Sequence, residues 1–315
     1  MLKGGIILSV AAAAVLAGCR AAPSSPVPAA DTKSGPVQGK VQVFVSILPQ
    51  VYFVERIGGA YVAATALVGP GQSPHTFEPT PNQMAKLSQS RLLLTIGWPF
   101  EKQLVDKVKG VNPDLRIVDT RQGIALRRMT PAEAAADADE PHPAAGHGPA
   151  GEPDPHFWLS PRLAKTMAGT IATALAEADP PHAAEFQKNL EDLDADLDRL
   201  DGALAKTLAP LKGKDFFVYH PAFGYFADAY GLRQVPVEIE GKEPTARQLA
   251  AIVARAKAEG VRVIFVQPQF SSKSAEAIAR TIGGAVVPMD DLARDYIANL
   301  NDMAEKIQKA IGTEN

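Results

Sequence analysis

The stretch PPHAAEFQKNLEDLDADLDRLDGALAKTLAPL, residues 180–211, carries one apolar stripe at helical spacing. The stripe recurs every three or four residues, at Phe186, Leu190, Leu193, Leu197, Leu200, Leu204, Leu208 and Leu211. About thirty residues at 1.5 Å each form a helix of roughly 45 Å, with Asp, Glu and Lys on its other faces. A coiled-coil dimer is the alternative, but about four heptads between α/β segments fit an internal helix better. We expect this helix to connect two lobes.

The chain on the N-terminal side of this helix alternates short β-branched runs with helical patterns. Strands are predicted at 41–47, 62–69, 91–97 and 116–120, and helices at 50–58, at 83–90 and from residue 99 onward. Such alternation is typical of a parallel α/β sheet. Within this N-terminal lobe, residues 41–179, the segment from Arg121 to Pro155 has no apolar periodicity and is rich in Ala, Asp, Glu, Pro and Gly. We expect a long, mobile surface loop there.

The chain on the C-terminal side, residues 212–315, repeats the alternation. Strands are predicted at 215–220, 233–239, 261–267 and 286–290, and helices at 221–230, after a cap at Thr245, from Ser272 and up to about Ile311. The predicted fold class is therefore α/β, with two lobes of parallel sheet joined by one long rigid helix. Ligands of such sheets bind beyond the carboxyl ends of the strands, so we expect the site in the cleft between the lobes.

The composition narrows the classes of function. The 315 residues are enough for two domains, and 46% hydrophobic residues exclude a disordered chain. A formal net charge of −3 provides no excess of positive charge for binding nucleic acid, so no such partner is expected. The single cysteine excludes an internal disulfide and a zinc site of paired cysteines. A transition metal would therefore depend on carboxylates and on the six histidines.

The N-terminal residues MLKGGIILSVAAAAVLAGC predict export. A basic start precedes an apolar run from Ile6 to Leu16, which is too short for a comfortable membrane span and is typical of a secretory signal peptide. The residues Leu-Ala-Gly before Cys19 resemble the lipobox of bacterial lipoproteins, which implies removal of residues 1–18 and acylation of Cys19. An ordinary signal peptide with an incidental cysteine is the alternative. Residues 19–40, rich in Pro, Ala, Ser and Gly, would then tether the protein to a membrane, in the periplasm or at the cell surface.

Four short motifs stand where predicted strands end, and each contains a residue type that binds metals. They are GPGQSPHTFEPTP (69–81) with His75, DPHFWLSP (154–161) with His156, VYHPAFGYFADAYGL (218–232) with His220, and VVPMDDLARDY (286–296) with Asp290. Proline adjoins each histidine and stiffens the backbone that aims its ring. Three imidazoles and one carboxylate suit Zn²⁺, and Mn²⁺ less well. Separations of 64 to 81 residues match no local spacing rule, so the fold must gather the motifs.

Other polar residues are weaker candidates. His142 and His147, within the loop, either capture metal loosely or are simply solvated. Glu78 is expected to orient a ligand rather than to bind the metal. The rest are expected to be structural or solvated: Asp291 and Asp295 in the first turn of the last helix, Glu238, Glu240 and Glu243 at a solvated edge, and His182 without a role.

The motifs together resemble those of one family, the zinc and manganese solute-binding proteins of ABC transporters, cluster A-I. The segments that carry the resemblance are HTFEPTP, DPHFWLSP, YHPAFGYFADAYGL and the Asp-Asp-Leu-Ala run at 290–293. The resemblance extends from about Val41 to the C-terminus. It implies two α/β lobes bridged by a rigid helix, as the stripe in residues 180–211 predicts.

The resemblance also implies the ligands, by matching motifs: His75, His156, His220 and Asp290. The family usually has Asp-Pro-Leu at the last position, where this chain has Asp290-Asp291-Leu292, so two aspartates are available. Manganese members often carry Glu in place of His220, which favours zinc here. Zinc members commonly carry a long His-rich acidic loop. In this chain the loop has only two histidines, which weakens the argument for zinc over manganese.

The function that the resemblance implies is capture of Zn²⁺ outside the cytoplasmic membrane and delivery to an ABC-type permease, by a monomer without catalysis. A protein of the same class for Mn²⁺ or Fe²⁺ is the first alternative. A zinc hydrolase is the second, although the chain has no H-E-x-x-H motif and Glu78 is the only obvious general base. A lipid-anchored adhesion or redox module without metal is the third, but one acylated cysteine leaves no thiol for redox chemistry.

Overall fold

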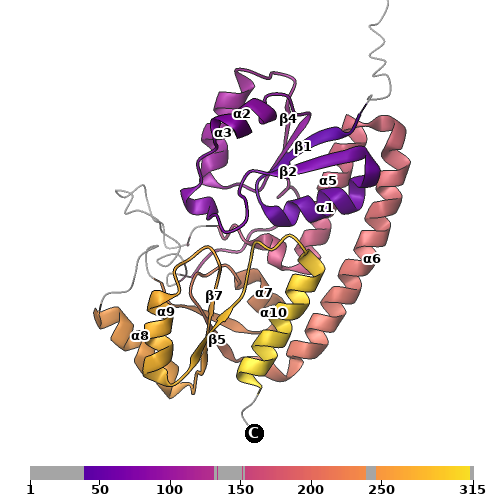
Figure 1. The fold of residues 1–315 in the computed structure, drawn as a ribbon. Helices are drawn as coiled ribbons and strands as arrows, with labels where there is room; N and C mark the ends of the chain where they lie inside the picture. The colour runs from indigo at the N-terminus through magenta and orange to yellow at the C-terminus, as the bar shows by residue number, and fades with distance from the viewer. Residues whose placement is uncertain (1–38, 131–132, 134–150, 152, 239–245, 313–315) are drawn as a thin grey trace, which may run out of the picture. The chain divides into compact units, whose positions relative to one another are not determined.

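The computed structural model describes residues 39–130, 133, 151, 153–238 and 246–312, all within one compact unit, Pro36–Asn315. Two lobes of parallel sheet lie beside one long helix (Figure 1). The predicted signal peptide, most of the tether, Cys19, His142, His147 and Thr245 fall outside the described residues. Among the helices within these ranges, none has both the length and the apolarity that crossing a bilayer requires.

The N-terminal lobe contains a four-stranded sheet in the order β2-β1-β3-β4, with all neighbours parallel. Its strands are β1 (Val41–Val45), β2 (Val62–Ala66), β3 (Leu92–Thr95) and β4 (Arg116–Asp119). The connections contain α1 (Leu48–Gly58), α2 (Pro81–Leu87), α3 (Pro99–Lys109) and two 3₁₀ turns, η1 (Gly59–Tyr61) and η2 (Pro74–Thr76). Every residue of β3 is buried, which is typical of a parallel strand covered on both faces.

The C-terminal lobe repeats this arrangement, with a parallel sheet in the order β6-β5-β7-β8. Its strands are β5 (Asp215–Val218), β6 (Arg233–Pro236), β7 (Val263–Val266) and β8 (Ala285–Pro288). Its helices are α7 (Gly224–Tyr230), α8 (Ala246–Ala258), α9 (Lys273–Ile282) and α10 (Tyr296–Ile311). In each lobe the first strand lies inside the sheet, between the second and the third. The predicted α/β class with two parallel sheets is confirmed.

Two neighbouring helices, α5 (Pro161–Ala178) and α6 (Ala183–Leu208), stand between the two sheets in the chain order. The 3₁₀ turns around them are η3 (Phe157–Leu159), η4 (Pro180–His182) and η5 (Ala209–Leu211). The 26 residues of α6 confirm the predicted long helix, at roughly 39 Å for 1.5 Å per residue. Its α-helical part ends before the predicted 211, because Pro210 has no N–H to donate and the last turn tightens into η5.

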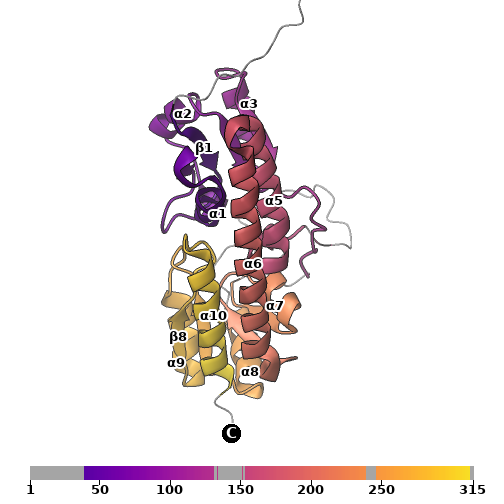
Figure 2. The same ribbon diagram turned by 90° about the vertical axis from the view of Figure 1, so that its right-hand side faces the viewer.

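The apolar stripe of α6 is buried within the chain itself. Its fully buried members are Phe186, Leu193, Leu197, Leu200, Leu204 and Leu208. The helix packs against α1 and α5 near the N-terminal sheet and against α7 and α10 near the C-terminal sheet, and Figure 2 shows it running past both lobes. Buried residues of the two lobes therefore form one hydrophobic cluster. The stripe serves internal packing, as expected, rather than a coiled coil.

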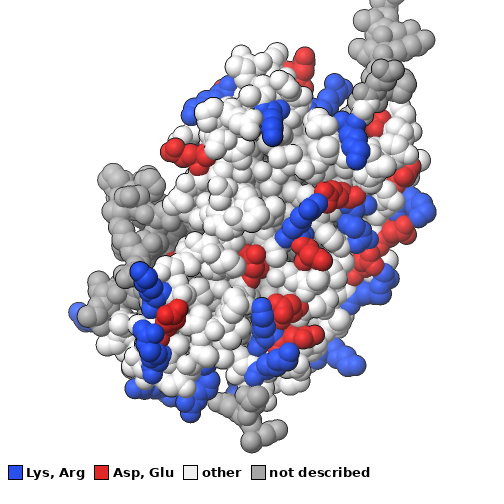
Figure 3. Space-filling model, viewed as in Figure 1, with Lys and Arg blue, Asp and Glu red and all other residues white. Residues whose placement is uncertain are grey.

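The outer face of α6 is solvated. Basic and acidic side chains alternate along the edge of the molecule that this helix forms (Figure 3). Among them are exposed pairs such as Lys188 with Asp192, 2.6 Å apart, and Lys165 of α5 with Asp198, 2.7 Å apart. Such pairs contribute little to stability, so burial of the stripe is what holds α6 in place.

Replacement of Leu197, which has no exposed surface, tests this packing. Leu197→Ala leaves a cavity where both lobes share their core, so we expect the free energy of unfolding to fall by about 2–5 kcal/mol. Urea denaturation followed by circular dichroism measures it. The matched control is Lys206→Ala on the exposed face of α6, which should change stability by less than about 0.5 kcal/mol. Equal stabilities of the two variants would contradict the packing role of the stripe.

Candidate metal centre

His75 lies in η2, in the turn that follows β2 of the N-terminal lobe. Pro74 opens this turn and is buried, and the Ser73 hydroxyl accepts a hydrogen bond from the His75 backbone N–H at 3.2 Å. The ring is partly buried and meets the edge of the Trp98 ring, with centroids 4.7 Å apart. The predicted Pro-rich turn therefore aims this imidazole toward the C-terminal lobe.

His156 lies just before η3, in the segment that leads into α5. Its side chain is 1% exposed, and its Nδ1 lies 2.9 Å from Oδ1 of Asp154. The same carboxylate oxygen accepts the His156 backbone N–H at 2.9 Å. An ionised carboxylate only accepts, so Nδ1 carries the proton and Nε2 is left as the metal-binding nitrogen.

His220 follows β5 directly and is 3% exposed. Its Nδ1 lies 2.6 Å from Oε1 of Glu238, which is 2% exposed. Gln267 pairs with the His220 backbone at both N–H and C=O, at 3.2 and 2.8 Å. Burial lowers the pKa of His220 well below its ordinary value, and the neighbouring His75 and His156 lower it further. The imidazole is therefore neutral at physiological pH, the form that binds metals.

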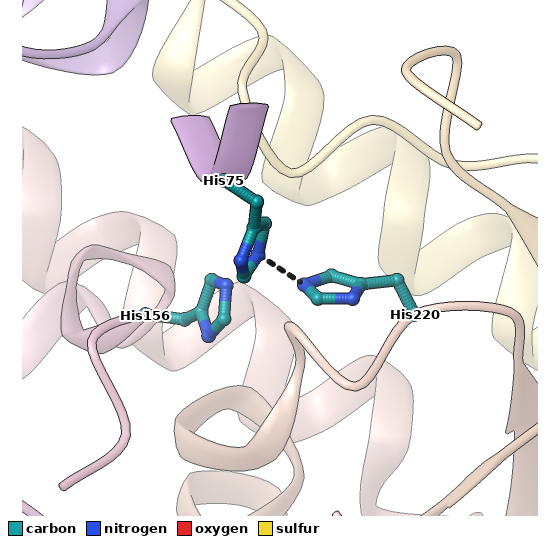
Figure 4. Close-up of side chains that lie close together, drawn as sticks. All are labelled: His75, His156 and His220. Carbon is teal, nitrogen blue, oxygen red and sulfur yellow. Dashed lines mark hydrogen bonds between the residues drawn. The ribbon is translucent and has the colours of Figure 1, made fainter. Parts of the chain in front are cut away.

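The three histidines meet at one point. Nε2 of His75 lies 3.3 Å from Nε2 of His220, and each of the three residues offers a ring nitrogen within 4.8 Å of the others (Figure 4). Tetrahedral zinc with Zn–N bonds of about 2.0–2.1 Å holds its nitrogens about 3.3–3.4 Å apart. The His75–His220 spacing already matches this geometry. The site predicted from the strand ends therefore brings together all three predicted histidines.

The carboxylate that faces these histidines is Asp291. Asp291 is 5% exposed and lines the same cavity, and its Oδ1 is buried without a hydrogen-bond partner among the described residues. Burial raises the pKa of Asp291 to about 6, although the nearby His156 opposes this shift. The expectation that Asp291 serves the first turn of the last helix is wrong, because Asp295 fills that place and accepts the Ala298 N–H.

Asp290, the aspartate assigned from the motif, is not among the residues that line the cavity. Its Oδ1 accepts hydrogen bonds from the Gln269 side chain and from the Leu292 N–H, both at 2.9 Å. Its backbone C=O accepts from the Asn299 side chain at 2.7 Å. Asp290 thus closes the turn after β8, and the next residue faces the histidines.

The cavity between the histidines encloses about 10 Å³, which is about the space of one water-sized sphere. Its walls are Ser73, Pro74, His75, Trp98, His156, His220, Gln269, Phe270, Asp291 and Leu292. Phe270 stacks on His220 with centroids 4.8 Å apart, and Trp98 lies against His156 at 5.6 Å. The aromatic rings of Trp98 and Phe270 therefore form part of the cavity wall around the three imidazoles.

Glu101 holds the backbone from which Trp98 projects. Its carboxylate accepts the N–H groups of Ile96, Gly97 and Trp98 at 2.9, 2.7 and 3.0 Å, and also the Ser46 hydroxyl. Burial raises the pKa of Glu101 even though these hydrogen bonds oppose the shift. The aromatic wall beside His75 therefore has a rigid support at the carboxyl end of β3.

Comparison with known proteins places this arrangement in a family. The family model described as "ZnuA: Zinc-uptake complex component A periplasmic" matches residues 43–310. The chain belongs to this family. The resemblance to zinc-type solute-binding proteins of ABC transporters is thereby confirmed.

Individual members of the ZnuA family resemble the chain over most of its length. The "High-affinity zinc uptake system protein ZnuA" of Bacillus subtilis (strain 168) is 30% identical over 295 residues, covering 93% of this chain and 90% of the relative. A crystal structure of ZnuA is 39% identical with a TM-score of 0.78, covering 86% of this chain and 99% of that one. A ZnuA deletion mutant with zinc bound is also 39% identical, with a TM-score of 0.77 and coverage of 88% and 100%.

The structure also shows where the other polar residues assigned from the sequence lie in this ZnuA-family chain. Glu78 is exposed and does not line the cavity, whereas Asp154 and Glu238 contact histidine rings. The expectation that Glu238 belongs to a solvated edge is wrong, because the chain after β6 turns this side chain inward onto His220. His182 stacks on Tyr61 and pairs with Asp179 at the turn between α5 and α6, away from the metal centre.

The raised pKa of Asp291 predicts how the metal-free protein responds to pH. A folded-state pKa of about 6, above the ordinary value of 3.8, means that the ionised carboxylate destabilises the fold as pH rises from about 4 to 6. Asp291→Asn should therefore stabilise the chelator-treated protein at pH 7.5, by on the order of 1–3 kcal/mol, and should lose this advantage toward pH 4. Thermal unfolding across this pH range measures the difference. Asp290→Asn is the control, and the same pH-dependent gain in both variants would contradict the assignment.

Proposed function

We propose that this chain captures Zn²⁺ outside the cytoplasmic membrane and delivers it to the permease of an ABC transporter. The observation that carries the proposal is the meeting of three imidazole nitrogens from three distant segments at the spacing of zinc ligands. Membership in the family of the zinc-uptake component supports it. The zinc ion is cargo that the protein binds and releases.

The ligand set that we propose is His75, His156 and His220 through their ring nitrogens, with Asp291 as the fourth ligand. Asp291 replaces the aspartate assigned from the motif, because the Oδ1 of Asp290 already accepts two hydrogen bonds and its side chain lies outside the cavity wall. The buried Oδ1 of Asp291 is a carboxylate oxygen without a partner in the described structure, and a divalent cation supplies that partner. Three nitrogens and one oxygen complete a tetrahedral shell.

The donor set favours Zn²⁺ over Mn²⁺. Imidazole suits zinc, whereas manganese prefers oxygen ligands in octahedral geometry. An octahedral ion would need two further ligands, whereas the three imidazoles with Asp291 supply the four ligands of a tetrahedral shell. A binding protein specific for Mn²⁺ or Fe²⁺ is therefore disfavoured by the same donor set that suits zinc.

Two carboxylates behind the rings strengthen zinc binding. Asp154 and Glu238 accept from Nδ1 of His156 and His220, which fixes each tautomer with Nε2 directed at the metal and raises the basicity of the ring. Together with Asp291 they supply buried negative charge around a site that takes a doubly charged cation. Acidification protonates the imidazoles and should release the ion.

Hydrolysis and metal-free roles fit this site less well. A catalytic zinc keeps one position open for water, whereas Asp291, the fourth ligand that we propose, lines the same cavity and would take that position. Glu78, the only general-base candidate of the sequence, is exposed outside the cavity wall. An adhesion or redox module without metal would leave three converging imidazoles without a purpose.

The cellular setting is part of the proposal. We infer an exported monomer that acyl chains on Cys19 anchor to a membrane, with residues 20–40 as the tether. His142 and His147 remain candidates for accessory metal capture. Incorporation of labelled fatty acid into the wild-type chain, and its loss in Cys19→Ser, tests the anchor.

Titration of apo-protein with Zn²⁺ against a chromophoric chelator tests the ligands. His220→Ala should weaken binding more than 100-fold, because it removes a ligand, and Asp291→Asn should weaken it about 10–100-fold. Asp290→Asn is the matched control, with a loss below about fivefold. Wild-type affinity in His220→Ala would overturn the site, and a larger loss in Asp290→Asn than in Asp291→Asn would reassign the carboxylate.

The gain in stability on metal binding tests the selectivity of the site for Zn²⁺ over Mn²⁺. Zinc at 1,000 times its dissociation constant should add about 4 kcal/mol to the free energy of unfolding, because the ion binds only the folded chain. Thermal unfolding should show a large rise in midpoint with Zn²⁺, a much smaller one with equal Mn²⁺, and reversal by a chelator. An equal rise with both ions would contradict the selectivity argument.

A further inference from the structure

A nearly buried arginine, Arg127, joins three carboxylates beside the metal centre. Its guanidinium nitrogens lie 2.6 Å from Asp154, 2.9 Å from Asp228 and 3.2 Å from Glu133. Only 16% of the Arg127 side chain is exposed. Burial alone would lower the pKa of Arg127, but the hydrogen bond to Asp154 raises it, so the side chain stays charged. A charged group held by three carboxylates has one well-defined position.

Asp154 divides its two oxygens between this arginine and a proposed zinc ligand. Oδ2 binds Nη1 of Arg127, and Oδ1 accepts from the backbone N–H of His156 and lies at hydrogen-bond distance from its Nδ1. The Asp154 N–H in turn donates to the Arg127 C=O at 2.9 Å. The position of the His156 ring therefore depends on Asp154, and that of Asp154 on Arg127.

The other contacts of Arg127 reach the C-terminal lobe. Asp228 and Tyr225 both belong to α7, which begins four residues after His220. The Tyr225 hydroxyl accepts from the Arg127 N–H at 2.9 Å and donates to the Asp154 C=O at 3.0 Å. These contacts connect the segment that carries His156 to the helix that follows His220.

Gly224 makes this close approach feasible. A Cβ at Gly224 would lie 1.8 Å from Nη1 of Arg127 and 2.7 Å from Oδ2 of Asp154, so no larger residue fits without displacing the arginine. A Cβ at Gly169 of α5, by contrast, would meet no other atom within 4 Å. The two glycines form a matched pair for testing the contact.

We propose that Arg127 is a positioning residue of the zinc centre, which holds the His156 segment against α7 and thereby fixes the spacing of His156 and His220 and slows zinc release. The inference rests on the proposed zinc site. Release then requires the contacts of Arg127 with α7 to break before the two histidines can separate. A partner that displaces α7 or Arg127 would speed release without touching a ligand.

Stopped-flow release of Zn²⁺ to an excess of chromophoric chelator tests the proposal. Arg127→Lys keeps the charge but loses the planar fork, and Gly224→Ala keeps the arginine but displaces it. Tyr225→Phe removes one hydroxyl and keeps the ring in place. We expect about 10–100-fold faster release in the first two variants and a several-fold increase in the third. Circular dichroism checks that each variant is folded.

The matched controls are Gly169→Ala and Arg162→Lys, the latter at an exposed arginine that binds Asp201 at 3.0 Å. Both should release zinc within twofold of the wild-type rate. The absorption spectrum of the Co²⁺-loaded protein adds a readout of ligand geometry, and we expect its visible bands to shift in Arg127→Lys and Gly224→Ala only.

The outcomes separate this inference from the proposed function. A wild-type chain that binds no zinc overturns the proposed site itself. A wild-type chain that binds zinc, with wild-type release rates and Co²⁺ spectra in the folded Arg127 and Gly224 variants, overturns the role of Arg127 and leaves the zinc site standing.

Discussion

Burial of the leucine stripe of α6 is the constraint on which the metal centre depends. One rigid helix packs against both lobes through a shared hydrophobic cluster, so it sets the distance between the two sheets. Exposing a buried leucine costs about 1.5–3 kcal/mol, and a wide opening of the lobes would expose several. The helix keeps the carboxyl ends of both sheets near enough for one ion to bridge them.

The metal centre contains several carboxylates that are buried away from solvent. Asp154, Glu238 and Asp291 are all at most 5% exposed, and no described lysine or arginine lines the cavity that they surround. Arg127 compensates Asp154 and the His220 ring contacts Glu238, whereas Oδ1 of Asp291 has no hydrogen-bond partner among the described residues and burial raises the pKa of Asp291. The metal-free centre is thus an unfavourable arrangement that a divalent cation corrects.

Much of this could be predicted from the sequence, because strand ends, prolines and histidines carry strong local signals. The long helix, both sheets and the meeting of His75, His156 and His220 follow from them. The choice between Asp290 and Asp291 could not be made, since one step along the backbone reverses the direction of a side chain after a strand. Glu238 resembled a solvated acid because its neighbours in sequence are acidic. Trp98 and Phe270 also stand at strand ends, but aromatic residues there are usually taken for core. Arg127 lies in a stretch without the apolar periodicity of a helix or strand, so only the folded chain shows what it contacts.

The distance between the ligands along the chain has a consequence for where the protein acquires its ion. His156 lies 81 residues after His75 and 64 residues before His220, so no two of them form a chelating pair in an extended chain. A chain that crosses a membrane before it folds therefore has no assembled metal site. The site forms only once the chain has folded on the other side.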